Sequence, residues 1–234
     1  MANRRDFLAA AASAAALAAL PVGRTRAAGG EAKPLKILVL GGTGFLGPHF
    51  VAAARAHGHS LTLFNRGKSA PDRFSAAEYA DIEQLRGDRK TDMTALEGRT
   101  WDAVLDTSAY LPGDVTRSAT LLADKVKHYL IISTISVYAR MDTPGMDEAG
   151  ELAKLADPTV QEITGETYGG LKALSEQAAE AAMPGKVTVI RPGLIVGPGD
   201  PTDRFTYWPA RFDRGGEVLA PAPEDGPTQF IDVR

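Results

Sequence analysis

Residues Leu35 to Gly47 read LKILVLGGTGFLG, and the expected architecture follows from them. The stretch begins with a continuous apolar run, which is typical of a strand buried on both faces of a parallel sheet. The run ends in a turn in which Gly41, Gly44 and Gly47 are spaced three residues apart. A tight turn and a close backbone approach to a pyrophosphate both need residues without side chains. The pattern therefore predicts a dinucleotide-binding turn that connects a strand to a helix.

After this turn, the sequence alternates between helical and strand-like patterns. Helical spacing extends over residues 44–57, 71–80, 112–125 and 168–183, and short apolar runs occupy residues 60–64, 85–89, 101–107, 128–133 and 186–191. Such alternation predicts an α/β fold, a Rossmann-type doubly wound parallel sheet with right-handed crossovers. Ligands of these sheets bind beyond the carboxyl ends of the strands.

The composition is that of an ordinary globular protein. The chain has 234 residues, of which 44% are hydrophobic and 24% charged, so a disordered or fibrous chain is excluded. It has no cysteine, which excludes disulfides and thiolate metal sites. The formal net charge of −3 lacks the basic balance of most nucleic-acid-binding proteins. His57 and His59 have no carboxylate placed beside them, so we expect a surface pair and no metal site.

The first 30 residues differ from the rest of the chain. Arg4 and Arg5 precede an apolar, alanine-rich run from Leu8 to Leu20, and two further arginines follow. A charged start, a short apolar core and small residues are typical of an export signal. The core is too short to anchor the protein stably in a membrane. NRRDFL resembles the consensus of the twin-arginine pathway, whose machinery moves folded proteins.

We therefore predict that residues 1–28 are an export signal peptide, cleaved after Ala27 or Ala28, and that the protein is exported to the periplasm. Four arginines and one aspartate would leave with the peptide, which changes the formal net charge from −3 to −6. Because the twin-arginine machinery accepts folded proteins, a cofactor could be bound before export. The alternative interpretation is a disordered alanine-rich tail.

The residues after the second expected strand bear on the cofactor. An acidic residue there would bind the ribose 2′-hydroxyl of NAD, whereas an arginine accommodates the 2′-phosphate of NADP. Asn65 and Arg66 occupy these positions, and no carboxylate follows until Asp72. The sequence therefore favours NADP, with NAD as the alternative cofactor. The other interpretation is an exposed basic turn without a role in binding.

Tyr168 and Lys172 are four residues apart on an expected helix, so both side chains lie on one face. A tyrosine has a pKa of about 10, too high for a base at neutral pH, and a nearby ammonium would lower it. The pair could then transfer a proton while a nicotinamide cofactor carries the hydride. Thr134, in the segment STISVY after the fifth strand, could hold the substrate oxygen beside this tyrosine. Hydroxyls that merely close a turn are the alternative.

These motifs together resemble the NAD(P)-dependent epimerase/dehydratase family, the extended branch of the short-chain dehydrogenase/reductases. The resemblance runs from Lys36 to the C-terminus and rests on GGTGFLG, RGDR, STISVY, YGGLK and RPGLIVGP. It implies three catalytic residues, Thr134, Tyr168 and Lys172. The expected cofactor-binding residues are Gly41, Gly44, Phe45, Leu46, Gly47, Asn65, Arg66, Asp88, Thr107, Ser108 and Lys172. In the family pattern Asp88 would contact adenine, and residues 191–198 would close over the nicotinamide.

The resemblance also divides the chain. Residues 35–191 would form the NAD(P)-binding Rossmann domain, and residues 192–234 the start of a small substrate-binding region. Tyr207, Trp208 and Arg211 are candidate substrate contacts there, or packing residues. In relatives the final FIDVR strand leads into more of the substrate domain, so we expect a fragment with an incomplete substrate pocket. Members of the family often pair through two helices of the cofactor domain, which implies a homodimer.

Two departures from the family pattern bear on the reaction and on the site. Sugar-nucleotide dehydratases carry an Asp-Glu pair directly after the catalytic threonine, but this chain has Ile135 and Ser136, which argues against dehydration. The segment between Val137 and Tyr168 is longer than in many relatives and rich in acidic residues and proline. We expect this segment to cover the site.

Two functions follow from these observations. The one we favour is an exported NAD(P)-dependent epimerase or oxidoreductase that acts on a hydroxyl or carbonyl substrate, such as a nucleotide sugar. The other is a non-catalytic dinucleotide- or RNA-binding protein on the same fold, because NRG after the second strand also resembles the chloroplast stem-loop RNA-binding branch. The acidic charge and the expected export argue against RNA. We therefore expect a small-molecule substrate and no nucleic-acid partner.

Overall fold

The computed structural model describes residues 33–143, 145–219 and 228–234. The residues from Pro34 to Arg234 form one compact unit. The expected signal peptide, residues 1–28, lies outside the described residues. All described helices and strands belong to the unit Pro34–Arg234.

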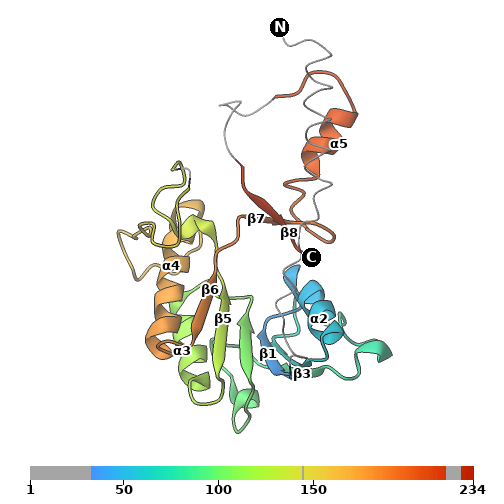
Figure 1. The fold of residues 1–234 in the computed structure, drawn as a ribbon, viewed down its shortest axis with the longest axis vertical. Helices are drawn as coiled ribbons and strands as arrows, with labels where there is room; N and C mark the ends of the chain where they lie inside the picture. The colour runs from blue at the N-terminus through green and yellow to red at the C-terminus, as the bar shows by residue number, and fades with distance from the viewer. Residues whose placement is uncertain (1–32, 144, 220–227) are drawn as a thin grey trace. The chain divides into compact units, whose positions relative to one another are not determined.

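Six parallel strands form the central sheet, in the order β3-β2-β1-β4-β5-β6 (Figure 1). The strands are β1 (Lys36–Leu40), β2 (Ser60–Asn65), β3 (Glu83–Arg86), β4 (Ala103–Asp106), β5 (His128–Ile132) and β6 (Val187–Ile190). The strand order reverses between β1 and β4, and such a reversal opens a ligand crevice at the carboxyl ends of the strands. The predicted α/β, Rossmann-type doubly wound sheet is confirmed.

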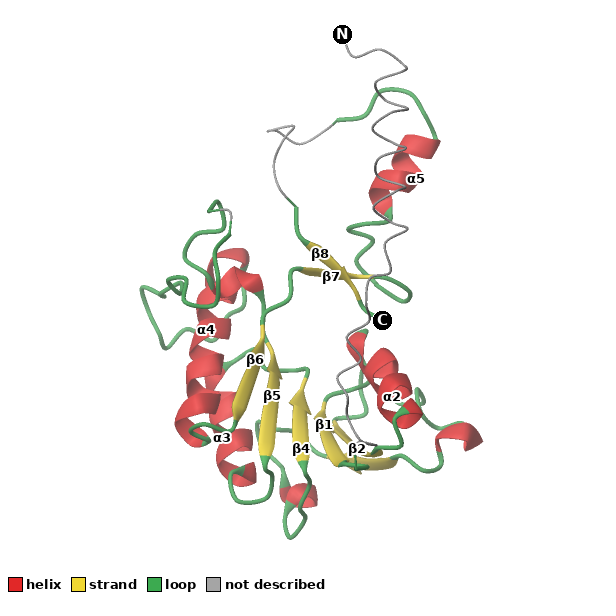
Figure 2. Cartoon of the chain, viewed as in Figure 1, coloured by secondary structure: helices red, strands yellow, loops and turns green. Residues whose placement is uncertain are grey.

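Helices cover both faces of this sheet (Figure 2). They are α2 (Leu46–Ala56) on one face, and α3 (Pro112–Leu122) and α4 (Gly165–Ala182), packed together, on the other. Strand β1 serves both faces: Ile37 and Val39 pack in the apolar cluster of α2, whereas Leu38 and Leu40 pack in the cluster of α3 and α4. Burial on both faces explains the continuous apolar run at the start of the glycine motif.

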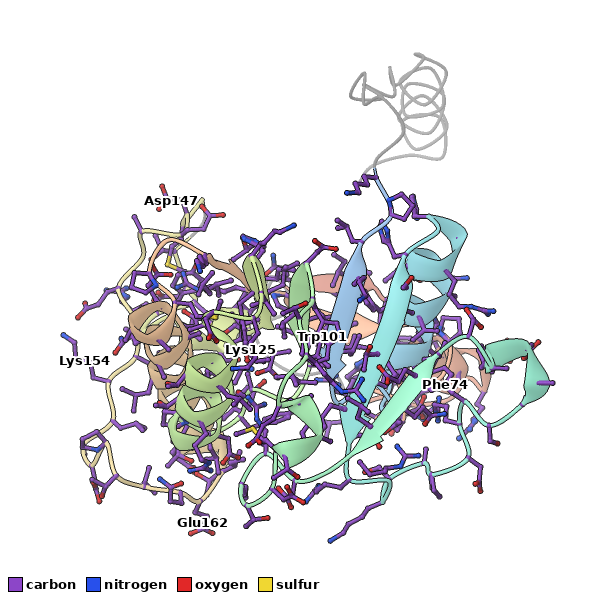
Figure 3. The ribbon with its side chains drawn as sticks, turned by 90° about the horizontal axis from the view of Figure 1, so that it is seen from below. Phe74, Trp101, Lys125, Asp147, Lys154 and Glu162 are labelled. Carbon is purple, nitrogen blue, oxygen red and sulfur yellow. The ribbon has the colours of Figure 1, made fainter. Side chains whose placement is uncertain are left out.

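The buried Trp101 is hydrogen-bonded, whereas several charged side chains of the segment before α4 lie at the surface. Trp101 is 6% exposed and donates its indole N–H to the Thr62 hydroxyl at 3.1 Å. The segment before α4 carries Asp147, Lys154 and Glu162, whose side chains point away from the sheet (Figure 3). This distribution follows the cost of burying an unpaired polar group.

The remaining elements are short. Strands β7 (Leu194–Val196) and β8 (Phe230–Asp232) pair in parallel as a separate sheet, and α5 (Tyr207–Asp213) lies in the connection between them. Three 3₁₀ helices are η1 (Ala77–Tyr79), η2 (Thr94–Leu96) and η3 (Ile135–Val137). The third, η3, lies within the STISVY segment, residues 133–138, which follows β5.

The prediction of a helix over residues 71–80 is wrong. The structure has only turns there, followed by η1. The backbone N–H and the hydroxyl of Ser75 both donate to the carbonyl oxygen of Asp72, at 3.1 and 2.8 Å. Such local side-chain bonding competes with a continuing helix.

The strand expected over residues 85–89 lies earlier in the chain, because β3 ends at Arg86. Asp88 and Asp92 exchange two backbone hydrogen bonds of 2.8 and 2.7 Å, which close a tight turn directly after the strand. Arg89 therefore lies outside the sheet. Its side chain is free to turn inward, with consequences for the site.

Candidate functional site

Two adjoining cavities lie at the switch in strand order. The tyrosine cavity has a volume of about 540 Å³ and is lined by all three predicted catalytic residues, Thr134, Tyr168 and Lys172. The asparagine cavity, named for Asn65, has a volume of about 460 Å³. Gly44, Thr107 and Tyr110 line both cavities. The two are therefore neighbouring parts of one crevice.

The predicted cofactor-binding residues divide between these cavities. The asparagine cavity is lined by Gly41, Gly44, Asn65, Arg66, Asp88, Thr107 and Ser108. The tyrosine cavity is lined by Phe45, Leu46, Gly47 and Lys172, and it shares Gly44 and Thr107. The structure thus brings every predicted site residue to one crevice, although strands and loops far apart in sequence supply them.

Two later segments border the same crevice. Met141 lines the tyrosine cavity and Ile163 lines the asparagine cavity, so the long segment before α4 borders both. Residues 192–195, from the RPGLIVGP motif, line the tyrosine cavity. The crevice is therefore bordered by chain that follows the β5 strand as well as by the glycine turn.

The glycine turn combines close packing with open space. Gly41 and Gly42 have φ angles of +98° and +82°, which favour glycine. A methyl group on Gly47 would collide with the carbonyl oxygen of Gly42, so this glycine lets α2 pack against the turn. A methyl group on Gly44 would meet no atom within 4 Å. Gly44 therefore borders open space in the crevice, and a side chain there would reduce that space.

The prediction that the Lys172 ammonium lowers the pKa of Tyr168 is wrong. Burial of the phenol and the neighbouring Tyr110 raise the pKa of Tyr168 above its ordinary value, and a hydrogen bond with Thr134 and the charge of Arg204 only partly offset the rise. The Lys172 ammonium donates instead to the carbonyl oxygens of Ala109 and Ile132, at 2.7 and 2.6 Å. The phenol is therefore protonated at neutral pH, and the lysine is held by backbone carbonyls.

Lys172 is itself strongly perturbed. Lys172 is only 3% exposed. Burial lowers the pKa of its ammonium to about 8, although the carboxylates of Asp106 and Glu176 oppose the shift. The ring of Tyr110 lies 5.3 Å from Nζ, within the range of a cation–π interaction. The ammonium is thus fixed between α4, the end of β5 and the loop after β4.

Two buried donors of the asparagine cavity lack partners. Asn65 accepts hydrogen bonds from the Gly67 N–H and from Arg86 at 2.9 and 2.6 Å. Its Nδ2 and the Nε of Arg89 are buried, and neither has a hydrogen-bond partner within the described part of the chain. Buried donors without acceptors are costly and rare. Both belong to residues that line the cavity, so a ligand with oxygen acceptors would suit it.

The family model of the NAD dependent epimerase/dehydratase family matches residues 37–234, which include both cavities. The chain belongs to this family. The resemblance drawn from the glycine motif and the segments after it is thereby confirmed. The expected signal peptide, residues 1–28, lies outside the matched residues.

One curated relative of this family member is the chloroplast stem-loop binding protein of 41 kDa b from Arabidopsis thaliana. The two are 32% identical over 118 residues, which cover 46% of this chain and 31% of the plant protein. The chain therefore spans about a third of the length of that relative.

Two solved structures share the fold. WbmG from Bordetella bronchiseptica, in complex with NAD, is 16% identical with a TM-score of 0.64, over 91% of this chain and 74% of that one. The UDP-N-acetylglucosamine 4-epimerase from Methanobrevibacter ruminantium M1, in complex with UDP-N-acetylmuramic acid, is 18% identical with a TM-score of 0.63, over 86% and 70% of the two chains. At these identities the likeness shows the Rossmann-like fold.

Sequence reasoning missed a buried ion pair below the asparagine cavity. Arg89 donates to both carboxylate oxygens of Asp106, at 3.0 and 2.8 Å, and the Tyr129 hydroxyl donates to the same carboxylate at 2.8 Å. Burial alone would raise the pKa of Asp106, but the charge of Arg89 and these hydrogen bonds lower it. A carboxylate at the end of a buried strand needs a cation nearby, and that signal could have directed attention to Arg89.

A second buried ion pair, also missed, lies beside the tyrosine cavity. Arg191 donates to both oxygens of Glu176, at 3.2 and 2.7 Å, and the Ser133 hydroxyl donates to the same carboxylate. The guanidinium also donates to the Tyr138 hydroxyl at 3.0 Å. Glu176 lies one turn after Lys172 on α4. The pair therefore connects the end of β6, the helix that carries Tyr168 and Lys172, and the residue that precedes Thr134.

Other candidates lie outside the crevice. Tyr207, Trp208 and Arg211 do not line the tyrosine cavity. The rings of His57 and His59 stack at 6.2 Å, and the part of the chain that the structure describes holds no cluster of metal-ligating side chains. Within the same residues, every helix is too short or too polar to cross a membrane.

Proposed function

We propose that this chain binds a nicotinamide dinucleotide along the crevice and acts as an epimerase or oxidoreductase on a hydroxyl or carbonyl group, such as that of a nucleotide sugar. Membership of the NAD dependent epimerase/dehydratase family supports the enzyme class. The NAD in the WbmG complex and the nucleotide sugar in the archaeal epimerase support the cofactor and the substrate class.

The observation that carries the proposal is the open space at Gly44 beside unpartnered buried donors. Gly44 lines both cavities, and its position at the start of α2 suits a pyrophosphate, because helix N-termini favour anions. Asn65 Nδ2 and Arg89 Nε would find acceptors in a nucleoside at the asparagine end. The residues present therefore fit a dinucleotide whose nicotinamide end enters the tyrosine cavity.

The reacting groups of the chain would then act as follows. A bound nicotinamide supplies hydride transfer to or from carbon. Thr134 orients the substrate oxygen, and Tyr168, protonated at neutral pH, donates a proton to a carbonyl oxygen or recovers one from a hydroxyl. Lys172, whose ammonium donates to two backbone carbonyls, could hold the nicotinamide ribose.

We also propose that the chain prefers NADP over NAD. Arg66 and Lys68 line the asparagine cavity, and basic side chains after β2 accommodate a 2′-phosphate. The test is to purify the protein, denature it and identify any released nucleotide by mass, followed by titration with NADP and NAD. NADP would support the role of Arg66, NAD would overturn that role alone, and binding of neither would overturn the dinucleotide proposal.

Gly44→Ala tests the position of the dinucleotide. Its backbone is compatible with alanine, since its φ is not positive, so the free energy of unfolding should change little. The methyl group would enter the space proposed for the pyrophosphate and weaken dinucleotide binding by about 10- to 100-fold. Gly113→Ala in α3, where a methyl group meets only the end of Arg117 at 3.7 Å, is the matched control. Equal dinucleotide affinity in both variants would contradict the proposed path.

Tyr168→Phe tests the catalytic assignment. The variant keeps the ring and its packing but removes the proton that the mechanism transfers, so turnover should fall by about 100-fold or more. Dinucleotide affinity should be unchanged. Retained turnover would remove Tyr168 from the mechanism, whereas loss of dinucleotide binding would show that the substitution disturbs the crevice.

The similarity to the chloroplast stem-loop binding protein supports a second candidate, RNA binding on the same fold. The acidic net charge of −3 argues against it. A gel shift with structured RNA at two salt concentrations tests this candidate. A salt-dependent shift by the protein, absent from a heat-denatured control, would favour it.

We also propose that residues 1–28 direct export through the twin-arginine machinery. The support is the charged start and alanine-rich core. A reporter fused to these residues should reach the periplasm, and replacement of Arg4 and Arg5 by lysine should retain it in the cytoplasm. Export that does not depend on the two arginines would overturn the proposed route.

A further inference from the structure

The tyrosine cavity is positively charged although the chain as a whole is acidic. The formal net charge is −3. Among the described residues that line this cavity are two cations, Lys172 and Arg204, and none of them is an aspartate or a glutamate. A cavity of one sign of charge raises the local concentration of ligands of the opposite sign. The charge pattern therefore favours an anionic substrate.

Of the two cations, Arg204 has donors to spare. The Lys172 ammonium is already held by two backbone carbonyls. Arg204 donates Nε to the Thr202 hydroxyl at 2.8 Å, and no ion pair involves it within the described residues. The nearby Asp200 carboxylate interacts with the charge of Arg204, but its hydrogen bonds come from the backbone N–H and the hydroxyl of Thr202, at 2.9 and 2.6 Å. The two terminal nitrogens of Arg204 can therefore bind a carboxylate or phosphate in the two-pronged geometry that arginine favours.

Arg204 also lies near the proposed reacting group. It lines the same cavity as Tyr168, and its charge acts on the phenol. An anionic group bound at Arg204 would therefore share the tyrosine cavity with the carbon that reacts at Tyr168.

A third cavity, of about 600 Å³, adjoins the tyrosine cavity and also indicates where an anionic group would bind. It shares three lining residues with the tyrosine cavity, namely Ile135, Met141 and Gln229. Asp147 and Glu148 line it, and the charge of its Arg191 is balanced by Glu176 at 2.7 Å. An anionic group would be disfavoured on that side. The remaining cationic side of the site is that of Arg204.

We propose that Arg204 is a substrate-binding residue that recognises a carboxylate or phosphate of the substrate in the same cavity as the carbon that reacts at Tyr168. The substrate class is accordingly a sugar acid, a hydroxy acid or a phosphorylated sugar. The inference rests on the proposed function, because Tyr168 marks the reacting carbon. A neutral substrate would leave the guanidinium without an acceptor and forgo a charge-assisted hydrogen bond.

The test is calorimetric titration with matched neutral and charged probes, with and without bound dinucleotide. The pairs are glucose and glucuronate, glucose and glucose 6-phosphate, and UDP-glucose and UDP-glucuronate. The last pair carries the same diphosphate in both members, so it isolates the added carboxylate. The proteins are the native chain, Arg204→Gln, Arg204→Lys and the control Arg211→Gln, whose guanidinium binds the carbonyls of Gly215 and Glu217 outside the cavity.

In the native chain, the charged member of at least one pair should bind about 10- to 100-fold more tightly. Arg204→Gln should abolish that preference, Arg204→Lys should keep part of it, and Arg211→Gln should keep all of it. A preference for glucuronate over glucose 6-phosphate would identify a carboxylate, and the reverse a phosphate. Affinity for the dinucleotide should be the same in all four proteins.

Two results would overturn the proposal. One is the absence of any preference for the charged member in all three pairs, including the absence of binding. The other is a loss of dinucleotide affinity in Arg204→Gln, which would assign the guanidinium to the cofactor phosphates. Failure of the proposed function is distinguishable, because it would appear as no dinucleotide binding by the native chain, whereas the titrations without dinucleotide still report on Arg204.

Discussion

The two cavities each lie beside a buried arginine–carboxylate pair, but the pairs differ in what they join. Arg89 and Asp106, whose side chains are 11% and 0% exposed, connect the turn after β3 to the end of β4. Arg191 and Glu176, at 17% and 5%, connect the end of β6 to α4. The first pair is thus part of the sheet layer. The second is a brace between a strand and the helix that carries Tyr168 and Lys172.

The difference bears on the proposed division of the crevice into a dinucleotide-binding half and a reacting half. Tyr129 and Ser108 complete the bonding of Asp106 inside the core, so the floor of the asparagine cavity is inseparable from the stability of the sheet. Glu176 instead receives the hydroxyl of Ser133, the residue before Thr134. Changes to the first pair should therefore act on folding, and changes to the second on the alignment of reacting groups.

Asp106→Asn should give the largest loss of stability. The substitution leaves the Arg89 guanidinium buried without a counter-charge, which costs about 3–5 kcal/mol of unfolding free energy. Urea denaturation of the native chain and the variant measures this difference. Asp124→Asn is the matched control, since that carboxylate is 83% exposed in its pair with Lys125 and should cost less than about 1 kcal/mol. Similar midpoints for both variants would contradict the assigned role of the Arg89 pair.

Lys172 gives a smaller effect that depends on pH. Its pKa is lowered to about 8, so above that pH the folded lysine is neutral while the unfolded one, with a pKa of about 10.4, still binds a proton. Stability should therefore rise with pH between about 8 and 10, by no more than about 2 kcal/mol. Denaturation across this range should show the rise in the native chain and in Lys154→Met, a surface control, but not in Lys172→Met. A flat native profile would show that burial does not perturb Lys172.

The sheet was predictable because its signals are local. The unbroken apolar run of β1 and the glycine spacing after it encode a strand buried on both faces and a turn that approaches a phosphate. The placement of Tyr168 and Lys172 on one face of a helix was likewise predictable, because side chains four residues apart on a helix lie on the same face. The family match supports the architecture that these signals predicted.

The electrostatic environment was not predictable, because it depends on partners distant in sequence. Asp106 and Arg89 meet only through the turn that ends β3 early, and that turn depends on backbone bonds between Asp88 and Asp92. The pKa of Tyr168 depends on burial and on Tyr110 and Arg204, which no spacing rule places beside it. The spacing of the pair and its place after the fifth strand predicted that Lys172 acts on the phenol, yet the ammonium donates to two backbone carbonyls.

Glu176→Gln gives the smallest expected loss of stability and separates the two pairs most sharply. The Arg191 guanidinium is more exposed than that of Arg89, so water partly compensates the lost counter-charge, and the cost should be about 1–2 kcal/mol, below that of Asp106→Asn. Dinucleotide affinity should be unchanged, because Glu176 does not line the asparagine cavity. Turnover should nevertheless fall by about 10-fold, since weaker bonding to Ser133 loosens the alignment of Thr134 with Tyr168.

The measurement is kcat and KM of the native chain and Glu176→Gln, together with dinucleotide affinity and urea denaturation. Glu180→Gln, one turn further along α4, is the control, because its carboxylate only accepts from the Gly185 N–H at 2.8 Å on the surface. A fall in kcat at constant dinucleotide affinity supports a positioning role. If Glu176→Gln weakens dinucleotide binding as much as turnover, the two arginine pairs act alike. The separation of a binding floor from a catalytic brace would then be lost, and the crevice would behave as one cooperative unit whose halves cannot be altered independently.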